Sequence, residues 1–352
     1  MIKEFEKTFC LKNIEVGYLY FYLHFVVEVV CFYYLSIVTG GSNIVWLIPF
    51  LYDGLAFVPQ SIFGHLSDKY PKISFSLIGF SLTFIALLLS SYTSISVYIS
   101  LIILCIGNTF VHVNGAEVTL KNSNGKLSHA AIFVAGGSFG VVSGKLLAMY
   151  NWPPILVLIL ILTTIPFILL ADTYKNSKKS PNCTKFNYVK ESINPFLVIV
   201  LATLVVIIRG YMGYGIPTSW NKTVPQMIYL FCIMGLGKAL GGILSDRFGI
   251  RKVALISTVL AIPFLCLGDK YMWISLFGVM CFSMTMAITL GILVSVLKKH
   301  PGLAFGFTTI GLFLGTVPIF FIKLTMELNI IFIVVMSLIC TFILLSLLKK
   351  EG

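Results

Sequence analysis

The sequence is divided into twelve apolar runs, and this feature limits the possible folds more than any other. A helix needs about 20 largely apolar residues to cross the hydrocarbon core of a bilayer at about 1.5 Å per residue. Hydrophobic residues make up 58% of the 352 residues, charged residues make up 11%, and the mean hydropathy is +0.98. The sequence therefore predicts an all-α integral membrane protein with twelve transmembrane helices. The runs cover residues 16–39, 44–64, 73–93, 96–117, 129–149, 153–173, 195–216, 223–245, 253–268, 271–297, 302–323 and 328–348.

Most of the 25 basic residues lie in alternate breaks between the apolar runs. By the positive-inside rule these breaks face the cytoplasm, so we expect a multi-pass protein of the cell inner membrane with both termini cytoplasmic. The net charge of +12 thus indicates membrane topology, and no nucleic-acid partner is expected. The basic residues in these breaks are Lys3, Lys7, Lys12, Lys69, Lys72, Lys121, Lys126, Lys175, Lys178, Lys179, Lys185, Lys190, Arg247, Arg251, Lys252, Lys298, Lys299, Lys349 and Lys350.

Two breaks carry similar sequences about half the chain length apart. GHLSDKYPK follows the second run, and GGILSDRFGIRKV follows the eighth, with Asp68 and Asp246 at matching places. This repeat indicates an internal duplication. We expect a six-helix bundle at 1–174, a cytoplasmic linker at 175–192 and a second six-helix bundle at 193–352.

The repeated segments are interpreted as loops that form a conformational latch. Glycine lets two helices approach closely, and a carboxylate at a helix end can face the positive N-terminus of a neighbouring helix. The alternative is that these charges serve only to fix topology. The predicted latch residues are Gly64, Asp68, Lys69, Gly242, Asp246, Arg247 and Arg251.

The second copy resembles the G-x-x-x-D-[R/K]-x-G-R-[R/K] loop of the major facilitator superfamily. The first copy keeps Gly64, Asp68 and Lys69 but has Pro71 and Lys72 in place of the later Gly-x-Arg. The resemblance implies two pseudo-symmetric bundles with a substrate path between them and transport by alternating access. The matching residues of the second copy are Gly242, Asp246, Arg247, Gly249, Arg251 and Lys252.

Within that superfamily, several stretches are similar to the fosmidomycin-resistance family of drug exporters. His24 and Glu28 stand where that family has His followed by Asp, and residues 131–147 resemble its glycine-rich fifth span. Lys145 replaces a proline typical of exporters, and Val113 replaces another proline, so the direction of transport stays open. The matching residues in the fourth span are Phe110, His112, Asn114 and Gly115.

Ionisable residues inside the apolar runs are candidates for function because a charge at mid-bilayer is costly without a partner or a wet cavity. His24 and Glu28 are one helical turn apart and can share a proton. With Asp53 they form the predicted proton-coupling set. The alternatives are a static hydrogen-bonded pair for His24 and Glu28, and for Asp53 a buried pairing with Arg209 or a tyrosine hydroxyl.

The second half carries permanent bases inside its spans. The guanidinium of Arg209 suits a phosphonate, phosphate or carboxylate, whereas Lys238 could either bind solute or snorkel to the membrane surface. Glu117 is expected to form a surface or latch-loop ion pair beside Lys121. The predicted substrate-binding residues are Arg209, His112, Asn108, Lys238 and Tyr20.

These residues together favour a proton-coupled secondary transporter of a small anionic or zwitterionic organic solute, with efflux preferred. The alternatives are a proton-symport importer of a nutrient anion and a non-transporting receptor on the same fold. No cofactor, metal site or enzymatic activity is expected, because the sequence shows neither a phosphate-binding loop nor metal-ligand spacing among its histidines. The expected partners are the solute, protons and membrane lipids, and the chain is expected to be a monomer.

Overall fold

A computed structural model describes residues 14–40, 46–93, 95–175, 182–322 and 324–350. In these ranges twelve helical segments are long and apolar enough to cross a membrane, which confirms the predicted all-α, twelve-span architecture. The protein is a multi-pass membrane protein. Lys3, Lys7, Lys12, Lys178 and Lys179 lie outside the described residues. The helices are α2 (Ile14–Gly40), α3 (Leu47–Phe57), α4 (Gln60–Lys69), α5 (Phe75–Tyr92), α6 (Val97–Asn122), α7 (Leu127–Met149), α8 (Pro154–Leu162), α9 (Ile165–Lys175), α10 (Pro195–Gly215), α11 (Val224–Phe248), α12 (Ile250–Leu267), α13 (Met272–Val296), α14 (Pro301–Thr316), the 3-10 helix η1 (Val317–Phe320) and α15 (Met326–Leu347).

Three spans are interrupted, which the sequence pattern did not predict. The second span breaks between α3 and α4 at Pro59, which has no backbone N–H to continue the helical ladder. The sixth breaks between α8 and α9, where the hydroxyls of Thr163 and Thr164 donate to carbonyls within their own helix. The eleventh tightens into η1 beside Pro318.

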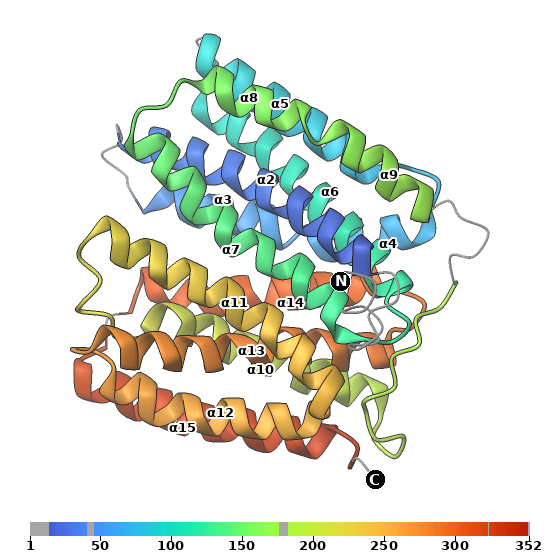
Figure 1. Ribbon diagram of the computed structural model, residues 1–352, viewed down its shortest axis with the longest axis vertical. Coiled ribbons are helices and arrows are strands. Elements are labelled where there is room, and N and C mark those ends of the chain that lie inside the picture. The colour runs from blue at the N-terminus through green and yellow to red at the C-terminus, as the bar shows by residue number, and fades with distance from the viewer. Residues whose placement is uncertain (1–13, 41–45, 94, 176–181, 323, 351–352) are drawn as a thin grey trace, which may run out of the picture.

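The first six spans (α2–α9) and the last six (α10–α15) form two neighbouring groups, the first above the second in Figure 1. Helix α2 begins and α15 ends at the same end of the molecule. Asp68 and Asp246 also lie at this end, in the last turns of α4 and α11, and we call it the aspartate end. Helices α7 and α11, and α14 with α4, pack across the boundary between the two groups.

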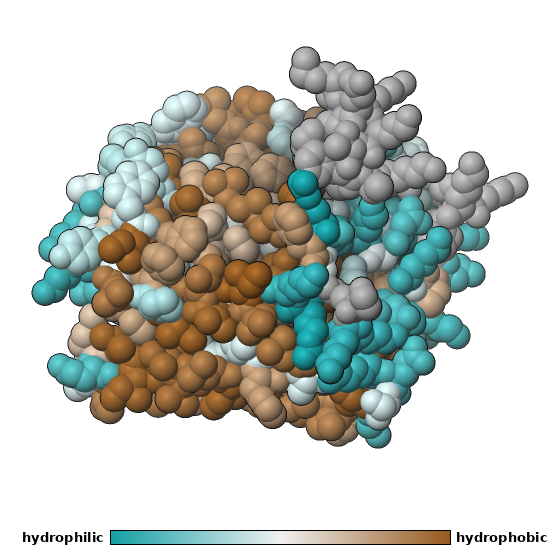
Figure 2. Space-filling view, turned by 60° about the horizontal axis from the view of Figure 1, so that its bottom comes forward, coloured by the Kyte–Doolittle hydropathy of each residue, from teal (hydrophilic) through white to brown (hydrophobic). Residues whose placement is uncertain are grey.

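A band of apolar side chains covers the outward face of the second group. Figure 2 shows this band between two ends that carry more hydrophilic residues. Phe342 of α15 is 75% exposed and Ile256 of α12 is 56% exposed. Large apolar side chains exposed at such levels suit lipid as the surrounding solvent.

Helix α7 packs against α2 through a row of glycines. A Cβ at Gly136, Gly140 or Gly144 would overlap the backbone carbonyls of Phe21, Phe25 and Val29 respectively. The absence of side chains therefore lets the two helix backbones approach closely, as small residues do in membrane helix pairs.

Replacing Gly140 by alanine should destabilise the protein, because the new methyl group would force α7 away from α2. Overpacking of this kind costs about 1–3 kcal/mol. The measurement is the melting temperature of the detergent-purified protein. Gly213→Ala is the matched control, since a Cβ there meets no atom within 4 Å. Equal melting temperatures for the two variants would show that this seam tolerates separation.

Candidate functional site

Two histidines and a glutamate from the first six spans meet in the interior. His24 and Glu28 share one face of α2, and His112 reaches them from α6. His112 Nε2 lies 3.2 Å from Glu28 Oε1, and His24 Nε2 lies 3.9 Å from the same oxygen. All three residues are at most 6% exposed. We call these three residues the His-Glu cluster.

Hydrogen bonds fix the tautomers of both histidines when they are neutral. His24 Nδ1 lies 2.9 Å from the carbonyl oxygen of Phe133, and His112 Nδ1 lies 2.9 Å from that of Asn108. Because a carbonyl only accepts, each Nδ1 must carry the hydrogen, which leaves each Nε2 with a lone pair. Two imidazole lone pairs and a carboxylate oxygen, all of them hydrogen-bond acceptors, therefore lie close together. A proton shared among them would relieve their mutual repulsion.

Asn108 supports the cluster from α6. Its side-chain nitrogen donates to Glu28 Oε1 at 3.1 Å and lies 3.2 Å from the hydroxyl of Tyr52 and 3.3 Å from Cys31 Sγ. Asn108 is fully buried. It holds Glu28 in place and links it to α3, a contact that the sequence did not specify.

Lys238 brings a basic residue of the second half close to the cluster. It lies within electrostatic range of Glu28 and His24. It shares a face of α11 with Gly235 and Gly242, which contact Phe139 and the N-terminal turn of α7. Lys238 thus faces the first group of helices, and the structure brings together His24, Glu28, Asn108, His112 and Lys238, five of the eight residues predicted for coupling and substrate binding.

The ligand atoms of the His-Glu cluster lie within 4.8 Å of one another, so by distance alone the cluster could hold a metal ion. The sequence spacing of the histidines did not reveal this arrangement, because it depends on how α2 and α6 pack. Charge opposes a metal here. A divalent ion would add two positive charges beside Lys238, whereas a shared proton adds one.

Asp53 of α3 is buried at 8% exposure. It makes no hydrogen bond or ion pair with any residue in the described ranges, so the predicted alternatives of pairing with Arg209 or a tyrosine hydroxyl are not seen there. It lies within electrostatic range of Glu28. Asp53 is therefore a second carboxyl group near the cluster, without a fixed partner.

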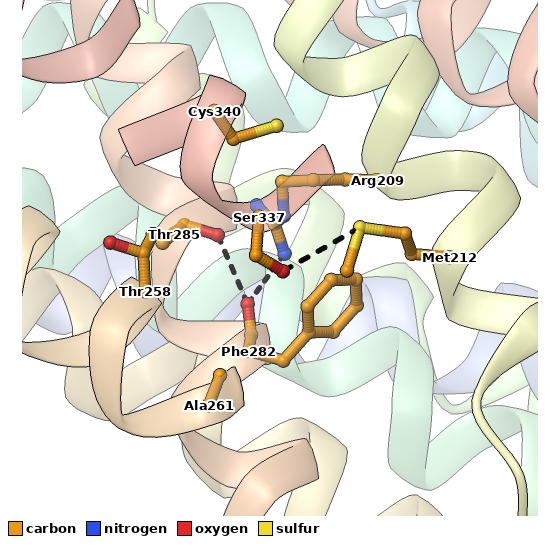
Figure 3. Close-up of a pocket in the computed structure, with 8 residues that line it drawn as sticks. All are labelled: Arg209, Met212, Thr258, Ala261, Phe282, Thr285, Ser337 and Cys340. Atoms are coloured by element: carbon orange, nitrogen blue, oxygen red, sulfur yellow. Dashed lines mark hydrogen bonds between the residues drawn. The ribbon is translucent and has the colours of Figure 1, made fainter. Parts of the chain in front are cut away.

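Arg209 lies apart from the cluster, inside the second group of helices. Figure 3 shows its guanidinium beside Phe282, with the side chains of α12, α13 and α15 around it. It donates to the Phe282 carbonyl at 2.7 Å and sits 4.7 Å from the centre of that ring. The adjoining cavity is about 20 Å³, which holds one water molecule or one monatomic ion and no organic solute.

Tyr20 is also away from the cluster. It is fully buried, and its hydroxyl accepts a hydrogen bond of 2.8 Å from the side chain of Asn114. Lys175 donates to the amide oxygen of Asn114 at 2.6 Å. In this closed structure Tyr20 is thus a member of a network within the first group of helices.

The expectation that Glu117 forms a surface or loop ion pair is only half right. Glu117 pairs with Lys121 at 2.7 Å, but it is 1% exposed and also accepts from Ser67 and contacts Lys175 at 3.2 Å. Packing of α4 and α9 against α6 buries the pair. The sequence missed Lys175 because that residue was assigned to the linker.

Both aspartates of the repeat hold the first turn of a helix in the opposite group. The backbone N–H groups of Gly302 and Leu303 in α14 donate to Asp68, each at 3.0 Å. Those of Leu127 and Ser128 in α7 donate to Asp246 at 2.8 and 2.9 Å. Each carboxylate thereby satisfies unpaired amides at a positive helix N-terminus.

The prediction that the repeated segments are loops is wrong up to the aspartates. Gly64–Lys69 lie inside α4 and Gly241–Phe248 inside α11, and the chain leaves the helix only at Tyr70 and Gly249. Gly249 has a φ of 95°, which a glycine adopts without strain. Because each aspartate lies in a regular helical turn, its side chain is directed across the boundary to the opposite group of helices.

The basic residues of the repeat have different surroundings. Arg251 donates to the carbonyls of Leu345 and Leu348 at 2.6 and 2.8 Å, so it binds the C-terminus of α15 within its own half. Arg247 lies over the ring of Phe248 and Lys69 over that of Tyr70. These contacts lie within one half, whereas those of the aspartates cross between the halves.

Helices α3 and α14 are also in contact at the end of the molecule opposite the aspartate end. Phe50 of α3 contacts Phe313 of α14 with ring centres 5.9 Å apart, and Phe320 of η1 with ring centres 5.2 Å apart. Lys145 of α7 lies over the ring of Phe231 in α11 at 4.9 Å. The structure therefore shows the two groups in contact at both ends, with the cluster enclosed between them.

A histidine pair beside Asp68 was not singled out from the sequence. His65 of α4 and His300, which directly precedes α14, have ring centres 5.4 Å apart across the boundary. Burial lowers the pKa of His300, and the charges of His65, Lys121 and Lys299 act in the same direction. Only the packing of α4 against α14 brings these rings together.

Solved structures share this arrangement of helices over nearly their whole length. A human organic anion transporter, MFSD10 (TETRAN), has a TM-score of 0.64 at 12% identity, covering 94% of this chain and 98% of that one. The Major Facilitator Superfamily transporter FucP, in an outward conformation, has a TM-score of 0.62 at 14% identity, covering 95% and 99%. This chain has the major facilitator fold.

A bacterial homologue of the iron transporter ferroportin, outward-facing, shares the major facilitator fold at a TM-score of 0.58 and 10% identity, covering 94% of this chain and 98% of that one. No protein-family model matches the sequence, and no curated protein sequence matches it. The finer resemblance to the fosmidomycin-resistance family therefore stays a prediction.

Acidification should loosen the aspartate end. The closed contact holds the pKa of His300 below its usual value of 6.5, so protons bind more tightly once the contact opens. Closure is therefore fully favoured above about pH 6.5 and weakens below it. The measurement is maleimide labelling of Ala304→Cys, a buried position in α14, in a variant whose native cysteines are replaced.

We expect the labelling rate to rise as the pH falls from about 7.5 to about 5.5, after correction for thiol ionisation on a free peptide. His300→Gln is the control, and its corrected rate should rise less than that of the parent protein. A constant rate in the parent protein, or an equal rise in His300→Gln, would exclude the histidine pair as the cause.

Proposed function

We propose that the protein is a proton-coupled secondary transporter that moves a small organic anion or zwitterion by alternating access. The observation that carries the proposal is the enclosed His-Glu cluster of the first half facing Lys238 of the second half. A buried carboxylate between two bare imidazole nitrogens is suited to bind and release one proton.

The charges of the site explain why the solute would be anionic. With a proton on the cluster, one carboxylate faces one imidazolium and the ammonium of Lys238, which gives a net charge of +1. An anion bound between the halves would neutralise this charge, and Lys238 could donate hydrogen bonds to it. The predicted donors His112 and Asn108 are engaged with Glu28 in this closed structure and would have to turn toward the anion. Without the proton the site is neutral and attracts the anion less.

Glu28, His24 and Asp53 are the proposed proton carriers. Asp53 has no fixed partner among the described residues and lies within electrostatic range of Glu28, so a negative charge on both carboxyl groups at once is unfavourable. Arg209 and Tyr20 do not contact the cluster in this closed structure. Their predicted contact with solute would require rearrangement within each half.

The two aspartates are the proposed latches. Asp68 holds α14 and Asp246 holds α7, so both must release their helix N-termini before the aspartate end can open. The close backbone contact of Gly64 with Gly302 and of Gly242 with α7 supports such a tight, separable seam. The basic residues near this end support a cytoplasmic orientation of both termini.

Similarity of fold supports the class of function. FucP is described as a fucose:proton symporter of E. coli, and the human protein as an organic anion transporter. We propose efflux across the cell membrane as the direction, on the sequence resemblance to exporters. An importer would use the same cluster, and a counterflow assay followed by accumulation in energised cells separates the two directions.

Glu28→Gln should abolish proton-driven transport while leaving solute exchange. Glutamine keeps the hydrogen bond with Asn108 but cannot bind a proton, so we expect at least a tenfold loss of net flux driven by a pH gradient. The measurement is pH change and labelled-solute flux in proteoliposomes tested with a panel of organic anions. Glu191→Gln is the control, since Glu191 is an exposed partner of Lys349.

Lys238→Gln should instead weaken solute binding, with exchange and driven flux reduced together. If Glu28→Gln kept full pH-driven flux, the cluster would not be the coupling site. If both variants and the parent protein moved no anion of the panel, while a neutral or cationic solute was transported, the charge argument for the substrate would be wrong.

A further inference from the structure

Arg209 is a permanent charge inside the second half that lacks a carboxylate partner in the described ranges. Its contacts are the carbonyl and the ring of Phe282. Neither carries a negative charge. A guanidinium does not lose its proton under physiological conditions, so the charge persists and requires compensation.

The acidic residues described in the linker and the second half cannot supply that compensation. Glu191 pairs with Lys349, Asp246 holds α7, Asp269 accepts from Ser219, and Glu327 lies in the first turn of α15. All four lie at or beyond helix ends, whereas Arg209 is well inside α10. Lys238 lies within electrostatic range and adds a second positive charge.

The Nε–H group of Arg209 is buried and has no hydrogen-bond partner in the described part of the chain. The cavity beside Arg209, which lies between α10, α12, α13 and α15, has a volume of about 20 Å³ (Figure 3). That volume is enough for one water molecule or one monatomic ion. The buried Nε–H donor of Arg209 is therefore accompanied by a neighbouring cavity that is large enough for one small ion.

We propose that this cavity binds a single halide ion, with chloride as the physiological ligand. The donors would be Arg209 Nε–H, the hydroxyl of Ser337 and the thiol of Cys340, which belong to three of the residues that line the cavity. The hydroxyl of Ser337 has only a long contact of 4.0 Å to Met212 Sδ. It is therefore available to a better acceptor.

The other two hydroxyls of the cavity are already committed. Thr285 donates to the Phe282 carbonyl at 3.0 Å, and Thr258 donates to the Ala254 carbonyl at 2.7 Å. A water molecule could accept from Arg209, but it would leave the positive charge uncompensated. An anion satisfies the donors and the charge together.

This site is separate from the proposed solute site and goes beyond the proposed function. A bound halide would join α10 to α15 through Arg209, Ser337 and Cys340, and so stabilise the second half as a unit.

The test is the melting temperature of the detergent-purified protein as chloride replaces gluconate at constant ionic strength. We expect a saturable rise of roughly 3 °C. Bromide should act like chloride, whereas sulfate, which is too large for the cavity, should act like gluconate. A linear response, or an equal response to all anions, would indicate general salt effects and overturn the proposal.

Two variants locate the site. Arg209→Gln should lose the chloride response, and Ala261→Leu, which fills the cavity but keeps the guanidinium, should weaken it at least tenfold in apparent affinity. Lys238→Gln removes a neighbouring cation that does not line the cavity, so the response should weaken less than in Arg209→Gln. Retention of the response in both Arg209→Gln and Ala261→Leu would place the ion elsewhere.

Bromide soaked into crystals gives a direct readout that does not depend on stability. An anomalous peak beside Arg209 Nε would confirm the site, and a peak in the parent protein only at other places would refute it. Because neither measurement uses transport, a failure of the halide proposal leaves the proposed proton coupling untouched, and the reverse also holds.

Discussion

The closed arrangement of this protein depends on carboxylates that bind helix N-termini across the boundary between its halves. Asp68 accepts from two amides of α14, and Asp246 accepts from two amides of α7. These hydrogen bonds are reversible, because water can hydrogen-bond the released amides and carboxylates when the aspartate end opens. They hold the seams whose closure buries Glu28 and its neighbours.

Enclosure gives the His-Glu cluster its chemistry. In water, two imidazoles and a carboxylate at these distances would interact weakly, since solvent would screen them. Inside the closed protein the three acceptors lie close together, and Lys238 brings a basic group of the other half within electrostatic range of them. The proposed coupling therefore rests on opening and closing, which alter the surroundings of one carboxyl group.

Much of the fold could be predicted from local sequence. The twelve spans follow from hydropathy, because each helix must satisfy its own backbone within the lipid. The breaks at Pro59 and Thr163 were missed, since a single proline or threonine in an apolar run does not reveal whether the helix kinks or stops. The repeated segments were located correctly but read as loops, because their charges masked the helical continuation to Lys69 and Phe248.

The sequence by itself determined the all-α membrane class and the number of spans, which follow from hydropathy, and the pairing of His24 with Glu28, which follows from their spacing along one helix. Only the tertiary structure decided that His112 and Lys238 join this pair and that Arg209 lies elsewhere. The physical reason is that an apolar helix surrounded by lipid can rotate about its axis at little cost. Packing through glycine seams sets that rotation, and with it the direction in which each polar side chain points.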